Sequence, residues 1–181
     1  MNYHNITYPD MNNGDGLRVV LWLSACSHHC YNCQNPQTWD VNSGIPFDEK
    51  AKDELFRELN KDYISGITFS GGDPLHENNL DGVLKLINEF RLSFPKKTIW
   101  LYSGFTWKEI MYPHLEPPYN LQKSQMLEKR KNILLKCDVF VDGRYIDSQR
   151  DITLPWRGSK NQRVIDVKKS VLQSEVVLHC D

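Results

Sequence analysis

Three cysteines lie close together in the chain, and their spacing predicts an iron–sulfur cluster. Cys26, Cys30 and Cys33 follow the pattern Cys-x3-Cys-x2-Cys, so one short loop could curl around a compact object and present three sulfurs to it. Thiolates are the soft ligands that suit the four irons of a cubane cluster. The two other cysteines, Cys137 and Cys180, are more than a hundred positions away. We therefore predict a [4Fe-4S] cluster with three cysteine ligands and one iron open to an outside ligand, the feature that separates reactive from structural metal sites.

The spacing of the cysteines also allows three other interpretations of this segment. A zinc ion bound by the three cysteines and by His28 or His29 is chemically possible, although zinc sites usually show a second pair of ligands a dozen or more residues further on. A redox pair formed by Cys30 and Cys33 would leave Cys26 unused. The cysteines could also bind nothing. We expect His28 and His29 to be solvent-facing loop residues.

A second candidate segment, Gly71-Gly72-Asp73-Pro74, follows a short apolar stretch. Glycine has no Cβ, so Gly71 and Gly72 would let a ligand approach the backbone, where free N–H and C=O groups could bond a carboxylate and an ammonium group. Asp73 could cap a following helix, and Pro74 fixes the turn. The alternative is a plain strand-to-helix turn that binds no ligand.

The surrounding sequence predicts strands that alternate with helices. Short apolar runs indicate strands at residues 17–23, 64–70, 98–102, 138–141 and 163–167. Helical spacing and cap residues indicate helices at residues 48–59, 78–90 and 121–136, and a short one after Thr106. This order favours a parallel sheet with right-handed crossovers, at whose carboxyl edge the active loops gather.

The length of the chain limits the fold class. A closed eight-unit barrel needs about 250 residues, and at least about 200, whereas this chain has 181. We therefore expect a single-domain α/β protein over residues 1–167, with the fold of a partial (open) β/α barrel and mostly parallel strands. Residues 168–181 carry no clear pattern and are expected to form a C-terminal tail, of a kind that is often mobile.

The composition excludes several classes of function. Lys and Arg total 22 against 23 Asp and Glu, and no block of five like charges occurs, so we expect neither nucleic-acid nor membrane-surface binding. No apolar run reaches the roughly 18 residues of a membrane span, and the N-terminus lacks a signal pattern. Three cysteines packed into so short a segment suit a metal better than a secreted disulfide framework. These features predict a cytoplasmic protein.

The cysteine spacing and the Gly-Gly-Asp-Pro segment resemble those of the radical S-adenosylmethionine superfamily. Within it, the chain resembles the family that activates the anaerobic ribonucleoside-triphosphate reductase. The matching segments occur in order at residues 13–18 (NGDGLR), 71–75 (GGDPL), 102–107 (YSGFTW), 141–144 (VDGR) and 156–162 (WRGSKNQ). Residues 113–132 look longer than is usual in the family, and the segment after residue 167 has no counterpart in it.

The resemblance implies an enzyme with two cofactors, the cluster and S-adenosylmethionine. The open iron would hold the amino and carboxylate groups of S-adenosylmethionine, and one electron would cleave it to methionine and a 5′-deoxyadenosyl radical. That radical would abstract a hydrogen atom from a glycine of the reductase and leave a glycyl radical there. The implied partners are thus the anaerobic ribonucleoside-triphosphate reductase and a one-electron donor such as a flavodoxin.

The resemblance also implies which residues hold S-adenosylmethionine. Its methionine end would meet Gly71, Gly72 and Asp73, and its adenosyl end would pass Asn32, Cys33 and Gln34. We expect Tyr102 and Trp156 to be core or interface aromatics. No role is assigned to the remaining polar residues of the matching segments, which are Arg18, Asp142, Arg157 and Asn161.

Two other classes of function stay open. The same radical chemistry could act on another glycyl-radical enzyme or on a small molecule. The chain could instead be a non-catalytic module that binds zinc or a cluster and recognises a partner. Metal and sulfide analysis of anaerobically purified protein separates the second class, because zinc without sulfide would favour it.

Overall fold

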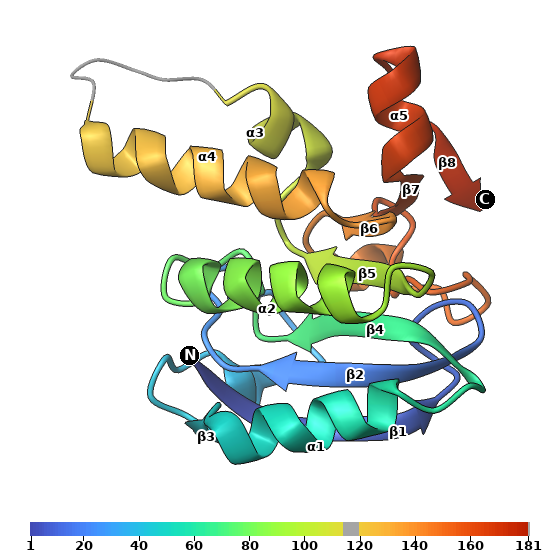
Figure 1. Ribbon diagram of the computed structural model, residues 1–181. Helices are drawn as coiled ribbons and strands as arrows, with labels where there is room; N and C mark the ends of the chain where they lie inside the picture. The colour runs from blue at the N-terminus through green and yellow to red at the C-terminus, as the bar shows by residue number, and fades with distance from the viewer. Residues whose placement is uncertain (114–119, 181) are drawn as a thin grey trace.

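Four parallel strands form the centre of the computed structural model, which describes residues 1–113 and 120–180 (Figure 1). They are β2 (Leu17–Leu23), β4 (Ile64–Gly71), β5 (Thr98–Ser103) and β6 (Val139–Asp142). One row of fully buried side chains crosses all four strands in register, through Leu21, Phe69, Leu101 and Phe140. Because the strands are parallel and in register, their carboxyl ends meet at one edge of the sheet.

Antiparallel strands extend this centre on both sides. On one side β1 (Asn2–Asp10) pairs with β2, and β3 (Ile45–Pro46) pairs with β1. On the other side β7 (Arg163–Asp166) pairs with β6, and β8 (Leu178–Cys180) pairs with β7. The strand order within the described residues is β3-β1-β2-β4-β5-β6-β7-β8. The predicted α/β class is therefore confirmed, whereas the prediction of mostly parallel strands is wrong for the outer strands.

Four helices of the described residues pack on one face of the sheet, and they begin within two residues of the predicted positions. In Figure 1, α1 (Glu49–Leu59) and α2 (Leu80–Ser93) lie in front of the strands, with α3 (Trp107–Met111) and α4 (Leu121–Leu135) above α2. Their apolar residues, such as Leu55, Val83 and Ile133, are fully buried in the main core. Asp48 caps α1 through Ala51 N, and Thr106 forms a capping box with Glu109 at α3.

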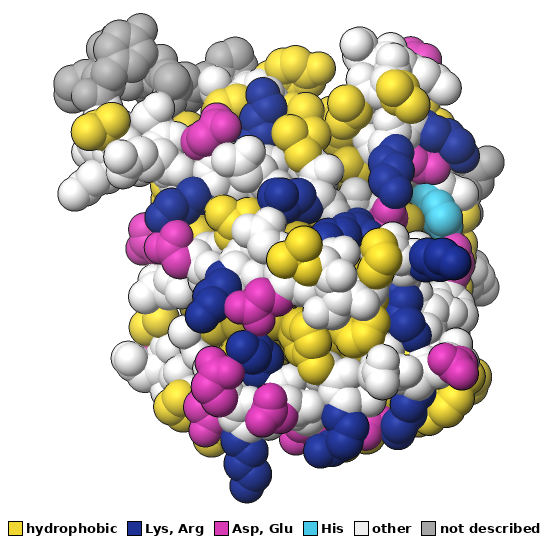
Figure 2. Space-filling view, in the orientation of Figure 1, with side chains coloured by type: hydrophobic (Ala, Val, Ile, Leu, Met, Phe, Trp, Pro, Cys, Tyr) yellow, Lys and Arg dark blue, Asp and Glu magenta, His cyan; other side chains and the backbone are white. Residues whose placement is uncertain are grey.

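The surface over these helices mixes both signs of charge (Figure 2). Ion pairs connect neighbouring helices: Lys52 of α1 lies 3.2 Å from Glu89 of α2, and Lys129 of α4 lies 2.6 Å from Asp81 of α2. Exposed pairs of this kind contribute at most about 1 kcal/mol each. This face therefore carries no block of one charge, in agreement with the even charge balance of the sequence.

Two terminal segments have regular structure that the sequence pattern did not predict. The N-terminal residues form β1, and the segment after residue 167 forms α5 (Val167–Gln173) and β8 instead of a patternless tail. Asp166 caps α5 by accepting a hydrogen bond from Lys169 N, and β8 pairs with β7. The boundary at residue 167 stays a prediction. No helix of the described residues is long and apolar enough to cross a membrane.

A buried cation holds the face of the sheet that the helices leave uncovered. Arg18 has no exposed surface, and its guanidinium donates to Thr68 Oγ1 (2.7 Å), Ile67 O (2.6 Å) and Thr98 O (3.1 Å). It also lies 5.5 Å from the ring centre of Trp100, in a cation–π contact. Burial lowers the pKa of Arg18 to about 10. Arg18 thus stabilises the central strands through neutral oxygen acceptors.

Replacing Arg18 with Met should lower the free energy of unfolding by about 3 kcal/mol, because the side chain keeps its length but leaves buried oxygens without a donor. Urea denaturation measures this change. The control is Arg150→Met at an exposed loop position, which should stay within about 0.5 kcal/mol of the parent chain. A loss below about 1 kcal/mol for Arg18→Met would contradict this account of the sheet.

Candidate functional site

A cavity of about 350 Å³ lies beyond the carboxyl ends of the central strands. The loop after β2 contributes all three clustered cysteines and Gln34 to its wall. The end of β4 contributes Gly71, Gly72 and Asp73, the end of β5 contributes Tyr102, and the loop after β6 contributes Arg157. The two segments that the sequence singles out thus meet at one cavity. Asn32 does not line the cavity and is exposed.

The backbone of the cysteine loop turns in the same way before each cysteine. Ala25, His29 and Asn32 directly precede the three cysteines, and they have φ angles of 71°, 47° and 54°. A non-glycine residue in this left-handed region costs roughly 1–3 kcal/mol. Such a cost, repeated three times in one loop, is typical of a functional site.

Burial disfavours the thiolate form of two of the three clustered cysteines. Burial raises the pKa of Cys26 to about 11, and burial is also the main cause that raises the pKa of Cys30. The nearby backbone N–H groups of His28 and His29 partly offset this rise in the pKa of Cys26. Metal ions bind thiolates and displace their protons, so iron would reverse the effect of burial. A set of three soft donors around a cavity fits a cluster better than a hard cation.

Three buried side-chain polar atoms in the described part of the chain have no hydrogen-bond partner, and all three belong to residues of the cavity wall. They are Trp39 Nε1, Tyr102 Oη and Arg157 Nε. Each carries a hydrogen to donate. An unpaired buried donor costs about 1–3 kcal/mol, so the cavity fits a ligand that carries several acceptor atoms. The expectation that Tyr102 is only a core aromatic is therefore incomplete.

The two glycines allow β4 to end close against the chain of β2. Gly71 has φ +99°, and a Cβ there would lie 2.6 Å from Leu23 N. A Cβ on Gly72 would lie 2.6 Å from Ala25 O, and the Gly72 N–H donates to Leu23 O at 2.7 Å. The expectation of a free N–H is therefore wrong for Gly72. Both positions therefore require glycine because a side chain would clash with the neighbouring backbone, whether or not a ligand binds there.

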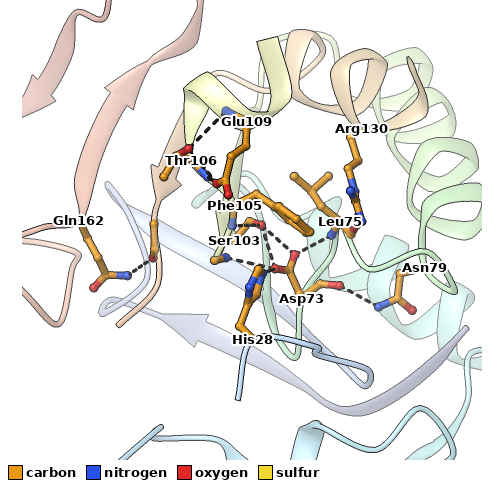
Figure 3. Close-up of polar contacts among 12 residues, drawn as sticks. His28, Asp73, Leu75, Asn79, Ser103, Phe105, Thr106, Glu109, Arg130 and Gln162 are labelled. Atoms are coloured by element: carbon orange, nitrogen blue, oxygen red, sulfur yellow. Dashed lines mark hydrogen bonds and ion pairs between the residues drawn. The ribbon is translucent and has the colours of Figure 1, made fainter. Parts of the chain in front are cut away.

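The carboxylate of Asp73 joins three segments at the wall of the cavity (Figure 3). It accepts hydrogen bonds from His28 Nε2 at 2.7 Å, from Ser103 Oγ at 2.8 and 2.9 Å, and from the backbone N–H groups of Gly104 and Leu75. The expectation that His28 faces solvent is wrong, because its side chain is 4% exposed. The expected helix cap is also wrong, since α2 begins only at Leu80.

The residues without an assigned role fall into two groups. Asp142 accepts hydrogen bonds from Trp107 N at 2.8 Å and from Arg163 Nε at 3.0 Å, so it connects β6 with α3 and β7. Asn161 Nδ2 donates to Arg144 O at 2.8 Å and shapes the loop after β6. Arg18 serves the sheet, whereas Arg157 belongs to the cavity.

No group of three or more His, Cys, Asp and Glu side chains in residues 1–113 and 120–180 is arranged to hold a single metal ion. The ligands of a four-iron cluster bind separate irons, so their sulfurs need not converge on one point. The cysteines line the cavity together with polar groups of other segments.

The comparisons with known proteins agree with this site. The family described as "4Fe-4S single cluster domain" matches residues 12–165. The chain is 38% identical to the anaerobic ribonucleoside-triphosphate reductase-activating protein of Escherichia coli (strain K12), over 91% of this chain and 97% of that protein. The proteins of the same name from Vibrio cholerae and Enterobacteria phage T4 are each 36% identical, over 90% and 91% of this chain and 96% and 93% of their own lengths.

Replacing Gly71 with Ala should lower the free energy of unfolding by at least about 2 kcal/mol, because Ala is strained at this φ and its Cβ meets the backbone of β2. Gly82→Ala in α2 is the control, since its Cβ would meet only the flexible Met1 side chain, at 2.7 Å. The control should stay within about 1 kcal/mol of the parent chain. Equal stabilities of the two variants, measured in urea, would argue against the close packing of β4 on β2.

The raised pKa of Cys26 predicts how this thiol reacts in the metal-free protein. Its rate of alkylation by iodoacetamide should rise about tenfold per pH unit between pH 8 and 10, because only the thiolate reacts and its fraction grows until the pH reaches the pKa. Peptide mass spectrometry follows this site separately from the other cysteines. A rate that levels off below pH 9 would show that burial does not raise the pKa.

Proposed function

The chain belongs to the family of anaerobic ribonucleoside-triphosphate reductase-activating proteins, and on this premise we propose that it is the enzyme that generates a glycyl radical on that reductase. One observation carries the proposal: the three cysteines, the Gly71-Gly72 turn and three residues with unpaired buried donors line one cavity. Thiols alone would suit a structural metal. Thiols beside residues with unpaired hydrogen-bond donors suit a metal centre that binds and activates a second ligand.

We assign the cluster to Cys26, Cys30 and Cys33, with one iron left open. When bound, the cluster supplies the single electron that splits the sulfonium of S-adenosylmethionine into methionine and a 5′-deoxyadenosyl radical. The chain supplies the geometry. Three left-handed residues shape the cysteine loop, and the three cysteines on it are only partly exposed. A one-electron donor such as a flavodoxin would deliver the electron in the cytoplasm.

We assign the rest of the cavity to S-adenosylmethionine. Its methionine end would meet the turn at Gly71, Gly72 and Asp73, and its adenosyl end would lie along Cys33 and Gln34 of the cavity wall. Asn32, which precedes them outside the wall, would take part only through the backbone that it shares with Cys33. Because the Asp73 carboxylate is already bonded to protein groups, Asp73 would act by holding this turn. The ligand offers acceptors in its carboxylate, ribose hydroxyls and adenine nitrogens, and the free donors of Trp39, Tyr102 and Arg157 fit them.

The sheet of the described residues is open, with β3 at one edge and β8 at the other, and an open sheet supports a macromolecular substrate. We propose that residues 1–167 form a partial barrel whose open side admits the glycine-bearing loop of the reductase. The 5′-deoxyadenosyl radical takes one hydrogen atom from that glycine and becomes 5′-deoxyadenosine, while the unpaired electron stays on the glycine. The cavity would hold the radical against its target and away from water, so that the hydrogen transfer outcompetes side reactions.

Anaerobic reconstitution tests this proposal. Protein loaded with iron and sulfide, then given dithionite, S-adenosylmethionine and the reductase, should release 5′-deoxyadenosine and produce a glycyl radical signal in electron paramagnetic resonance. The variants Cys26→Ala, Cys30→Ala and Cys33→Ala should each lose both products, because each lacks a ligand of the cluster. Cys180→Ser, outside the cavity wall, should keep both.

Three outcomes would contradict the proposal, each in a different way. Zinc without sulfide in anaerobically purified protein would indicate a binding module. Release of 5′-deoxyadenosine without a radical on the reductase would indicate another substrate. Full activity of the three cysteine variants would remove the cluster ligands from the account.

A further inference from the structure

A side-chain contact between His28 and Asp73 links the cysteine loop to the turn after β4, beside a backbone hydrogen bond from Asp73 N to Ala25 O at 2.7 Å. His28 Nε2 lies 2.7 Å from Asp73 Oδ2, and the two side chains are 4% and 3% exposed. The residues are 45 positions apart in the chain. A buried bond over this separation ties two segments that otherwise belong to different strand ends.

The hydrogen bonds around Asp73 decide which group donates to it. Ser103 Oγ accepts a hydrogen bond from Phe105 N at 3.1 Å, which leaves its own hydrogen for Asp73. The other neighbours of the carboxylate are the backbone N–H groups of Leu75 and Gly104, which can only donate. Asp73 is therefore an acceptor on every side, and His28 Nε2 must carry the hydrogen of the shared bond.

The imidazole of His28 sits in a slot that fits its shape. The ring of Phe105 packs against it edge to face, with ring centres 4.6 Å apart. A Cβ on Gly104 would lie 2.3 Å from the imidazole, so only glycine leaves room for it. Arg130 of α4 lies 4.0 Å over the Phe105 ring and donates to Leu75 O at 2.9 Å, which closes the slot from behind (Figure 3).

The backbone of His28 joins two of the cluster ligands. His28 follows Cys26 by two residues and precedes Cys30 by two residues. Anchoring the His28 side chain therefore fixes the backbone that surrounds two of the three sulfurs. Hydrogen bonds to ligand sulfurs and the orientation of ligands both tune a metal centre.

We propose that His28 is a positioning residue, whose bond to Asp73 holds the cysteine loop at a fixed distance from the turn at Gly71 and Gly72. The inference rests on the proposed function, because that distance matters only if the cluster and S-adenosylmethionine occupy the two sides of the cavity. His28 acts through the backbone and through Asp73 and takes no part in the reaction. A purely structural histidine would instead contribute to folding and leave the binding of S-adenosylmethionine unchanged.

Two substitutions separate these roles. His28→Gln keeps an N–H donor near the position of Nε2, whereas His28→Phe keeps an aromatic ring and removes the donor. Ser27→Ala, at an exposed position of the same loop, is the matched control. The readouts are iron and sulfide content after reconstitution, and the electron paramagnetic resonance spectrum of the reduced cluster during titration with S-adenosylmethionine.

We expect all three variants to take up the cluster. His28→Phe should need at least about tenfold more S-adenosylmethionine to change the spectrum, equivalent to about 1.4 kcal/mol of binding. His28→Gln should stay within about threefold of the parent protein, and Ser27→Ala should match it. Two results would overturn the inference. In one, His28→Phe needs no more S-adenosylmethionine than the parent protein; in the other, His28→Phe and His28→Gln lose the same amount of affinity for it.

A second measurement works on the metal-free protein and keeps the test independent of the proposed function. Amide hydrogen exchange in residues 26–33 should be at least about tenfold faster in His28→Phe than in His28→Gln, because only the latter retains the anchor. Equal exchange rates would overturn the inference even if no cluster forms. If His28→Phe does not fold, His28→Asn replaces it, since its shorter side chain does not reach Asp73. The failure of the parent protein to bind a cluster or S-adenosylmethionine would instead count against the proposed function.

Discussion

The buried carboxylate of Asp73 is the interaction on which the site depends. A charge removed from water is costly unless hydrogen bonds replace its hydration. Here the replacement comes from the cysteine loop through His28, from the end of β5 through Ser103 and Gly104, and from its own turn through Leu75. These groups can satisfy the carboxylate only while the three segments stay together. The register of the parallel strands brings them to one edge, and Asp73 joins them there.

This arrangement forms the cavity, and different walls of the cavity carry different functional groups. One wall carries the three thiols on a loop with three left-handed residues, and another carries the Gly71-Gly72 turn. Residues with unpaired hydrogen-bond donors, Trp39, Tyr102 and Arg157, also line the cavity. Strained backbone and unsatisfied donors destabilise the protein without a ligand, and functional sites are where such costs are retained. The main core beneath the cavity, packed by α1, α2 and α4, supplies the stability that offsets them.

The sequence predicted those parts of the molecule that carry local signals. The apolar runs of β2, β4 and β5 and the caps of α1 and α3 have such signals, and the structure places these elements within a residue or two of the predicted bounds. β1 and β8 lack them, because mostly polar strands near the sheet edges form through backbone pairing with a neighbour. The partial barrel stays a prediction, since the closure of a sheet depends on long-range geometry.

In the site, residue type and spacing predicted the roles of the cysteines and the glycines, but they did not distinguish the buried side chain of His28 from the exposed His29. The two histidines are adjacent, and only the turn at His29 sends one ring to Asp73 and the other to Trp39.

The central claim is that the open iron meets the methionine end of S-adenosylmethionine beside the Gly71-Gly72 turn. Electron–nuclear double resonance on the reduced cluster tests it, with ¹⁵N in the amino group and ¹⁷O in the carboxylate of the added ligand. The account predicts hyperfine coupling from both labels, and bound ligand without coupling from either would contradict it.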